Sequence, residues 1–359
     1  MQVLNQPFRE FYSSSRFRLP ERETLRSRFP EWLELEKWAV DFEQRATLYH
    51  LGVASDREFE FPLVGVSLGN QDPEAPTLGL FGGVHGLERI GSQVVLSLMR
   101  SFSELSLWDR GTQNKLSQCR LIFFPLINPS GVFRQTRSNG RGVDLMRNSP
   151  IDALETPSLL VGGQNLSPKL PWFRGYQQPE VEFQAVMKFC EAQFYKSQNA
   201  ITVDFHSGFG IQDQIWFPWA KTTKPFPHLP QMYRLTNKFE MTHPHHFYRI
   251  EPQAKNYTTH GDLWDHVYAE FMKVNASAYL PLCVEMGSWL WVRKNPIQLF
   301  SSLGPFNPLK PHRLKRILRR HHTFFDFLLR SIENTQSWGS LSPEEKSAAE
   351  QKALEKWYS

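Results

Sequence analysis

Residues 76–102 read PTLGLFGGVHGLERIGSQVVLSLMRSF, and this stretch decides the fold. Its first nine residues are nearly all apolar and include two consecutive glycines, which is typical of a central strand buried on both faces. The residues from Gly86 onward predict a helix, with apolar side chains recurring at helical spacing. A buried strand that leads directly into a helix indicates an α/β fold.

The same alternation of strands and helices continues along the rest of the chain. Further strands are predicted at residues 47–54, 59–69, 119–128, 200–208 and 279–289. Helices are predicted at residues 30–46, 179–193 and 314–332. Because strands and helices alternate, we expect one α/β sheet that is covered by helices on both faces.

Three segments differ in composition. Residues 1–44 form a polar N-terminal segment that ends in a helix, residues 45–335 form the main domain, and residues 336–359 form a helical tail. The tail begins with Ser342 as N-cap and Glu345 three residues later, which is the signature of a capping box.

Composition excludes several classes of protein. The chain has 359 residues and a formal net charge of +5, which is too small to indicate a nucleic-acid-binding protein by bulk charge. A basic stretch at 313–320 is interpreted as a solvated helix face, with nucleic-acid binding as a less favoured alternative. Three scattered cysteines indicate a reducing compartment, and no apolar run is long enough to span a membrane. We therefore expect a cytoplasmic protein with no membrane partner.

Three of the predicted strands end in residues that can do chemistry. His85 and Glu88 follow the first, His206 ends the second, and Glu285 ends the third. Ligand sites of open α/β sheets lie beyond the carboxyl ends of the strands, so these side chains are expected to converge. Two histidines and a carboxylate are the ligand set of a catalytic zinc ion, and a further carboxylate, Glu285, would take a proton from the metal-bound water.

The motifs that carry these residues resemble those of the zinc carboxypeptidase family of the carboxypeptidase A type. They are HGLE at 85–88, NPSGVFRQTRSNGRGVDLMRN at 128–148, DFHSG at 204–208 and VEMGSW at 284–289. The resemblance covers roughly residues 45–335 and implies a single α/β domain whose central, mixed and largely parallel twisted sheet is flanked by helices. It also implies peptide substrates, one zinc ion per chain held by His85, Glu88 and His206, and Glu285 as general base and acid.

The resemblance implies roles for three further residues. Arg134 in RQTR would polarise the scissile carbonyl and stabilise the oxyanion, a task that suits a fixed guanidinium. Asp144 would hold the His85 ring and fix its tautomer. Arg147 would bind the terminal carboxylate of the substrate through a bidentate fork.

The substrate pocket is less closely matched. Tyr257 is the candidate for the mobile tyrosine that covers the substrate, and Leu263 is expected to point into the specificity pocket, with Asp262 or Asp265 favouring a basic group. Many family members have asparagine where this chain has Met146, and that asparagine helps to hold the C-terminal carboxylate. The change weakens the carboxylate anchor and puts simple C-terminal trimming in question.

The leading hypothesis is a zinc-dependent hydrolase of peptide or peptide-like amide bonds, of carboxypeptidase type. The alternative is an amidase or deacylase that acts on a murein peptide or an N-acyl amino acid, which Met146 motivates. A non-catalytic binding protein with the same fold is disfavoured because the metal ligands and Glu285 are all present. A second metal site at His243, His245 and His246 is also disfavoured, since a surface loop explains that cluster.

Overall fold

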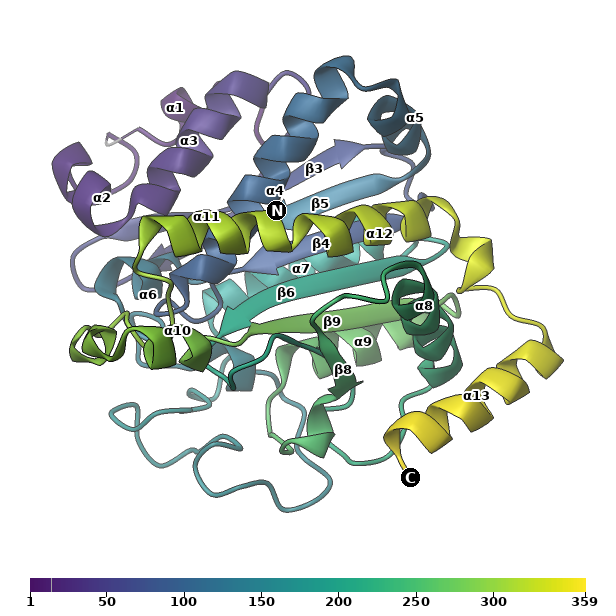
Figure 1. Cartoon of the computed structure of the whole chain (residues 1–359). Coiled ribbons are helices and arrows are strands. Elements are labelled where there is room, and N and C mark those ends of the chain that lie inside the picture. The colour runs from purple at the N-terminus through teal and green to yellow at the C-terminus, as the bar shows by residue number, and fades with distance from the viewer. Residues whose placement is uncertain (14) are drawn as a thin grey trace.

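A computed structural model describes residues 1–13 and 15–359 of the chain. The described residues form one sheet in the order β1-β2-β3-β5-β4-β6-β9-β7-β8 (Figure 1). The strands are β1 (Gln2–Val3), β2 (Thr47–Ser55), β3 (Glu60–Gly69), β4 (Thr77–Gly82), β5 (Arg120–Phe124), β6 (Ala200–Ser207), β7 (Gln214–Phe217), β8 (Arg249–Pro252) and β9 (Tyr279–Met286).

The centre of the sheet is parallel and its flanks are antiparallel. Strands β5, β4, β6 and β9 run parallel to one another, whereas β3 is antiparallel to β5, and β7 to β9. Every residue of β4 and β5 is buried, as the apolar runs that follow Thr77 and Arg120 predict. The mixed sheet of the predicted fold class is therefore confirmed, and the carboxyl ends of its four parallel strands meet along one edge.

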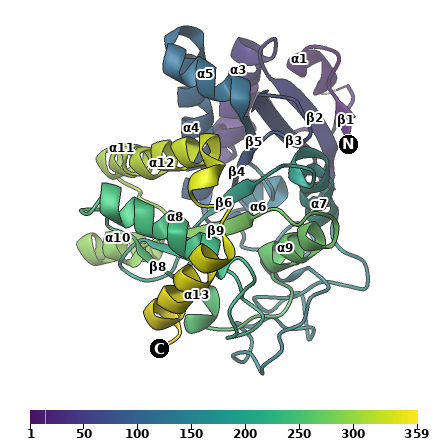
Figure 2. The same cartoon turned by 90° about the vertical axis from the view of Figure 1, so that its right-hand side faces the viewer.

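Helices cover both faces of the sheet. Figure 2 shows α4, α11 and α12 on one side and α7 and α9 on the other. The α-helices are α1 (Phe8–Phe11), α2 (Arg22–Arg28), α3 (Pro30–Phe42), α4 (Arg89–Trp108), α5 (Arg110–Gln118), α6 (Pro129–Arg134), α7 (Val181–Phe194), α8 (Leu229–Thr242), α9 (Leu263–Val274), α10 (Trp289–Lys294), α11 (Pro311–Arg320), α12 (His322–Glu333) and α13 (Pro343–Trp357). Short 3-10 helices are η1 (Leu145–Arg147), η2 (Gln253–Lys255), η3 (Pro296–Phe300) and η4 (Thr335–Ser337).

Both ends of the chain pack on the main domain. β1 pairs with β2 at the edge of the sheet, and buried aromatic side chains of residues 8–42 belong to the same hydrophobic core as the strands. At the other end, α13 begins with the predicted capping box of Ser342 and Glu345. The indole of Trp357 is buried and donates a hydrogen bond to the Ile250 carbonyl in β8. Residues 1–44 and 336–359 thus pack against the sheet and helices of the main domain.

The structure differs from the sequence prediction at residues 314–332. The predicted single helix is divided into α11 and α12 at His321, whose buried ring shares a hydrogen bond of 2.7 Å with the Tyr248 hydroxyl. The short strands β7 and β8 are also absent from the prediction, since four residues carry little periodicity. Among the described residues, no helix has the length and apolar character needed to cross a membrane.

Candidate functional site

The turn between β4 and α4 places His85 and Glu88 side by side. Gly86 lies against the Gly131 backbone, where a Cβ atom would collide with the Gly131 carbonyl, so only glycine fits there. Glu88 is the N-cap residue of α4, and its Oε2 accepts a hydrogen bond from the Ser207 N–H at 2.9 Å. Close packing of the turn thus fixes both side chains at the carboxyl end of β4.

Two contacts from distant parts of the chain hold this turn in place. Asn307 accepts a hydrogen bond from the Ile90 N–H at 3.0 Å and donates one to the Leu87 carbonyl at 2.7 Å. Arg89 forms a two-point ion pair with the buried Glu31 of α3. The turn that carries His85 and Glu88 is therefore clamped from both sides.

His206 approaches the same point from β6. It is paired in register with Glu285 on β9, so the two side chains leave the sheet next to each other. The Nε2 of His206 hydrogen-bonds the Asp204 carboxylate at 2.8 Å, and Asp204 also accepts from the Trp264 indole at 2.8 Å. Because Asp204 engages Nε2, the other ring nitrogen, Nδ1, is the one that faces Glu88, at 3.3 Å from Oε2.

The buried ligand atoms of His85, Glu88 and His206 lie within 4.8 Å of one another. Zinc binds nitrogen and carboxylate oxygen at about 2.0–2.2 Å, so three donors at this spacing can share one ion. The buried Nδ1 of His85 has no hydrogen-bond partner among the described residues. The donor set, its burial and this unsatisfied nitrogen all fit a metal ion.

The protonation states of the two histidines bear on metal binding. Burial, helped by the Arg137 guanidinium, lowers the pKa of His85 to about 3, so its ring is neutral and offers a lone pair at physiological pH. For His206, burial acts against the charged ring, but Asp204 outweighs it with help from other neighbours and the pKa lies well above its usual value. Metal binding at His206 therefore releases a proton.

A second group of ligand atoms, from Asp204, His206 and Cys283, lies next to the first. It shares His206, and its carboxylate already accepts hydrogen bonds from that ring and from Trp264. An ion held there would need the Nε2 that Asp204 engages. The first group is therefore the better metal site, and Asp204 is the residue that orients His206.

Glu285 lines the same cavity as the three ligands. One carboxylate oxygen, Oε2, is buried without a hydrogen-bond partner in the described part of the chain. Burial raises the pKa of Glu285 to about 8. A carboxylate in this position can exchange a proton with a water molecule near the ligand group.

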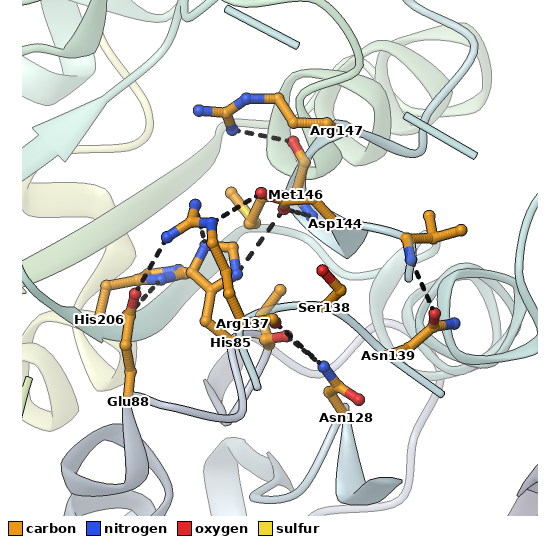
Figure 3. A network of polar contacts seen from close by, with 12 residues as sticks. His85, Glu88, Asn128, Arg137, Ser138, Asn139, Asp144, Met146, Arg147 and His206 are labelled. Atoms are coloured by element: carbon orange, nitrogen blue, oxygen red, sulfur yellow. Dashed lines mark hydrogen bonds and ion pairs between the residues drawn. The ribbon is translucent and has the colours of Figure 1, made fainter. Parts of the chain in front are cut away.

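Arg137 lies between the ligand residues, as Figure 3 shows. Its Nη2 is 2.8 Å from Nε2 of His85, its Nη1 is 3.4 Å from Oε1 of Glu88, and its Nε donates to Asp144 at 2.8 Å. It also lines the cavity beside Glu285. Arg137 is thus a cavity-lining guanidinium in direct contact with two of the three candidate metal ligands, His85 and Glu88.

The position predicted for Arg134 is wrong. Its guanidinium forms ion pairs with Asp56 at 2.8 Å and Glu58 at 3.4 Å, and it does not line the cavity. The reason is local: Arg134 ends α6, and the next residue, Gln135, has a left-handed conformation with φ of 56° that turns the chain. The turn sends the second arginine of RQTR, Arg137, into the cavity instead.

Asp144 lies beside His85 without a hydrogen bond to its ring, and Met146 and Arg147 follow it in the short helix η1. The Oδ1 of Asp144 is 3.7 Å from Nδ1 of His85 and also accepts from the Met146 N–H at 3.1 Å. Met146 and Arg147 are buried in the cavity wall. Arg147 donates to the carbonyls of Val161 and Met146 at 3.3 and 3.2 Å through Nε and Nη1, respectively.

The residues predicted for the substrate pocket are only partly brought together. Tyr257 lines the cavity, where its ring meets Trp216 edge-on at 5.9 Å between centroids. Leu263 does not line it: as the first residue of α9 it is 1% exposed and packs in the core, which corrects the prediction. Asp262 and Asp265 are occupied by backbone N–H groups, as N-cap of α9 and as acceptor for residues 220–221, respectively.

The cavity itself has a volume of about 630 Å³ and a mixed wall. Its ionic side chains, besides the ligands, are Glu285, Arg137, Arg147 and Lys169. The aromatic and aliphatic part of the wall consists of Met146, Val161, Leu170, Trp172, Phe209, Trp216, Tyr257 and Phe306. The histidines at 243, 245 and 246 line a separate pocket with Phe239 and Phe324, away from this site.

Sequence reasoning missed Arg137, Asp204 and the cavity residues of loop 161–172. Asp204 carried a usable signal, because residues two apart on a strand share a face and Asp204 precedes His206 by two. Arg137 carried a weaker one as the second arginine of RQTR. The loop carried none, since it has no regular periodicity.

A pair of buried glutamates supports the loop that carries Arg137 and Asp144. The side-chain amide of Asn139 donates to Glu180 at 3.0 Å and to Glu182 at 3.3 Å, and its oxygen accepts two N–H groups of the same loop. Burial raises the pKa of Glu182 to about 7. Glu182 thus holds a proton that the unfolded chain would lose at lower pH.

We expect Glu182→Gln to remove a pH dependence of stability. Between pH 4.5 and about 7 the folded wild-type chain binds one more proton than the unfolded chain, so its free energy of unfolding falls as pH rises through this window. The glutamine variant lacks this decrease in the free energy of unfolding. Above this pH window it should be about 1–3 kcal/mol more stable than wild type. Denaturant unfolding on both sides of the window measures this, with the exposed Glu23→Gln as control; parallel curves for Glu182→Gln and wild type would refute it.

Comparison with known proteins identifies the family. The model of the zinc carboxypeptidase family matches residues 23–288, which is most of the chain. Carboxypeptidase SOL1 of Arabidopsis thaliana is 29% identical over 124 residues, which cover 33% of this chain and 25% of the plant protein. The match thus spans only about a quarter of that relative's length.

Solved structures share the fold. Bovine thrombin-activatable fibrinolysis inhibitor, solved with a tick carboxypeptidase inhibitor, aligns with a TM-score of 0.60 and 15% identity over 87% of this chain and 97% of that one. Carboxypeptidase A from Helicoverpa armigera aligns with a TM-score of 0.59 and 12% identity over 83% and 73%. The matched sequence, the fold and the buried ligand group agree, and this chain belongs to the zinc carboxypeptidase family.

Proposed function

We propose that this protein is a zinc-dependent hydrolase of peptide or peptide-like amide bonds that acts next to a free C-terminal carboxylate. One observation carries the proposal: His85, Glu88, His206 and Glu285 converge on one cavity whose wall also holds the buried Arg147. The ligand residues bind the metal, Glu285 handles the proton, and Arg147 recognises the end of the substrate.

The proton step belongs to Glu285. A zinc ion, when bound, supplies a water molecule of lowered pKa and polarises the carbonyl oxygen. Glu285 takes a proton from this water and delivers it to the leaving nitrogen, as a general base and then a general acid. Its unpartnered Oε2 supports this role, because no other side chain competes for the proton there.

We assign the stabilisation of the developing oxyanion to Arg137 in place of Arg134. Arg137 lines the cavity and contacts both His85 and Glu88, whereas Arg134 pairs with Asp56 and Glu58 outside the cavity. A guanidinium that is already oriented by Asp144 needs little reorganisation when charge develops on the carbonyl oxygen.

Arg147 is proposed as the receptor for the substrate carboxylate. Backbone carbonyls hold its Nε and Nη1, which fixes the orientation of the guanidinium in the cavity wall. Met146 takes the place of the amide that assists this arginine in many family members, so the carboxylate is held by fewer donors. The aromatic wall around Trp216 and Tyr257 supports an apolar substrate side chain.

A second candidate is an amidase or deacylase that does not require the free carboxylate. Met146 favours it, because an apolar side chain at the anchor accepts an uncharged substrate end at little cost. The two candidates differ in one measurable property, which is the dependence of the rate on a free C-terminus.

Matched peptides with free and amidated C-termini separate the candidates. We expect the zinc-loaded protein to cleave the free peptides with a kcat/KM at least about tenfold higher, because a charge-assisted pair with Arg147 is lost on amidation. Arg147→Met should abolish this ratio and the exposed Arg141→Met should retain it. Equal rates on both peptides, together with cleavage of murein peptides or N-acyl amino acids, would favour the amidase.

Metal analysis tests the non-catalytic alternative in the same samples. We expect about one zinc ion per chain and loss of cleavage on chelation, restored by zinc. A chain without bound zinc and without activity after zinc addition would support a binding protein.

We also propose a reducing, cytoplasmic setting. Cys119, Cys190 and Cys283 are all buried and free, which supports a chain that needs no disulfide bond. Cell fractionation checks this, and recovery of the protein from an oxidising compartment would contradict it.

A further inference from the structure

The surface formed by α10, η3 and α11 is not used by the proposed reaction. A groove of about 250 Å³ separates α10 from α11. The basic side chains that line this cationic groove are Lys294, His312, Arg313, Arg316 and Arg320. No carboxylate of the described residues lines it, and the sequence between Glu285 and Asp326 contains no acidic residue.

The cationic groove has a fixed shape. Arg313 of α11 donates to the carbonyls of Trp291 and Lys294 in α10, at 3.1 and 3.3 Å, which ties the two helices together. Arg320 pairs with Asp213 at 3.2 Å. Arg316 and Lys294 are exposed and face solvent without an acidic partner within salt-bridge distance in the described residues. The groove therefore presents uncompensated positive charge.

An exposed apolar tip stands beside the groove. Directly after α10, the short helix η3 presents Ile297, Leu299 and Phe300, which are 75%, 48% and 93% exposed. Lys294 and Ile297 are three residues apart, so the tip continues from the groove. Figure 1 shows α10 and the N-terminal end of α11 on the same side of the molecule.

Cations beside exposed apolar side chains fit one kind of surface better than others. A soluble polyanion would neutralise the groove and leave Phe300 in water. An anionic lipid bilayer offers both headgroup phosphates for Lys and Arg and an apolar layer for residues such as Phe, Ile and Leu. Burial of the apolar tip away from water and contact of the groove with phosphate would both lower the free energy of binding.

We propose that the α10–η3–α11 surface docks this protein on an anionic membrane, with phosphates in the cationic groove and Ile297, Leu299 and Phe300 inserted at the headgroup boundary. This departs from the sequence-based expectation of no membrane partner, which rested on the lack of an apolar span. Docking of this kind needs no span.

The docking surface adjoins the catalytic cavity. Phe306, six residues after Phe300, lines that cavity, and Ser302 between them hydrogen-bonds Gln135 at 3.4 Å. Membrane docking therefore brings the cavity close to the bilayer surface and favours substrates that are themselves held there.

Co-sedimentation of the full chain with vesicles tests the proposal. We expect binding to vesicles of phosphatidylcholine with phosphatidylserine, no binding to phosphatidylcholine alone, and weakening as salt is raised. Phe300→Ser and Arg316→Glu should each weaken binding by about tenfold. The matched controls Leu159→Ser and Lys352→Glu, at exposed positions elsewhere, should stay within about twofold of wild type.

Three results would overturn the proposal. One is the absence of binding to anionic vesicles by a folded chain, with folding checked by thermal unfolding. Another is tight binding of duplex DNA, with vesicle binding unaffected by Phe300→Ser, which would make the surface a site for a soluble polyanion. The third is a dimer in solution that Phe300→Ser dissociates, which would make the partner a second copy. Cleavage of soluble peptides by Phe300→Ser and Arg316→Glu should equal wild type, since neither residue lines the catalytic cavity.

Discussion

Glu285→Gln is expected to lower kcat by about 10²–10⁴-fold while leaving KM within a few-fold. Glutamine keeps the size and shape of the side chain but cannot accept a proton from water or deliver one to the leaving nitrogen. Because the lost interaction operates only as the proton moves, the loss should appear in kcat and not in substrate binding. Initial rates on a peptide with a free C-terminus measure both parameters.

Electrostatics explain why the metal and Glu285 depend on each other. Burial, together with the neighbouring Glu88 carboxylate, raises the pKa of Glu285 to about 8, which would leave it mostly protonated at neutral pH. A divalent cation at the neighbouring ligand group favours the carboxylate and brings this pKa down. The proposed role of Glu285 as a base therefore depends on the bound metal.

The control for Glu285→Gln is its metal content. Glu285 is not among the ligand residues, so the variant should bind zinc as wild type does. Its free energy of unfolding should be unchanged or higher, since an amide replaces a buried ionisable group. Full activity in a zinc-loaded Glu285→Gln protein would show that the proton moves by another route.

Arg137→Ala is expected to lower kcat by about 10²–10³-fold, whereas Arg134→Ala should change it by about twofold or less. Arg137 lies in the cavity against His85, Glu88 and Asp144, while Arg134 is 38% exposed and pairs with carboxylates that do not line the cavity. The two arginines come from the same four-residue motif, which makes each the matched control of the other.

Arg137 also contacts the ligand residues, so its loss needs a readout besides rate. Zinc affinity, measured by competition with a chelator, separates a weakened metal site from a weakened oxyanion site. Free guanidinium added to Arg137→Ala should restore part of kcat if the side chain acts on the substrate carbonyl. A larger loss of kcat in Arg134→Ala than in Arg137→Ala would return the role to Arg134.

The strand ends explain how much of the site could be predicted. His85, Glu88, His206 and Glu285 follow long apolar strands, and the parallel centre of the sheet brings such ends to one edge whatever the loops do. Their convergence depends on topology, and topology depends on the apolar pattern, which the sequence displays directly.

The arginines and the pocket could not be predicted in the same way. The side of the loop on which Arg134 and Arg137 lie is decided by the left-handed conformation of Gln135, a residue type that seldom adopts it and so gives no warning. Leu263 moved into the core because Asp262 caps α9 one residue earlier and turns the first helical side chain inward. Each outcome depends on the conformation of one residue. The periodicity of apolar residues along a helix or strand does not predict such a detail.

The clamp on the metal-binding turn has a consequence for how the protein is made. Asn307, which holds Leu87 and Ile90, follows the turn by more than two hundred residues, with separations of 220 and 217. During synthesis on the ribosome, His85 and Glu88 therefore emerge long before the residue that fastens them, and His206 emerges between the two. The nascent chain presents loose ligands first and a rigid set only once Asn307 has emerged, so the ion should be captured after that point and not before it.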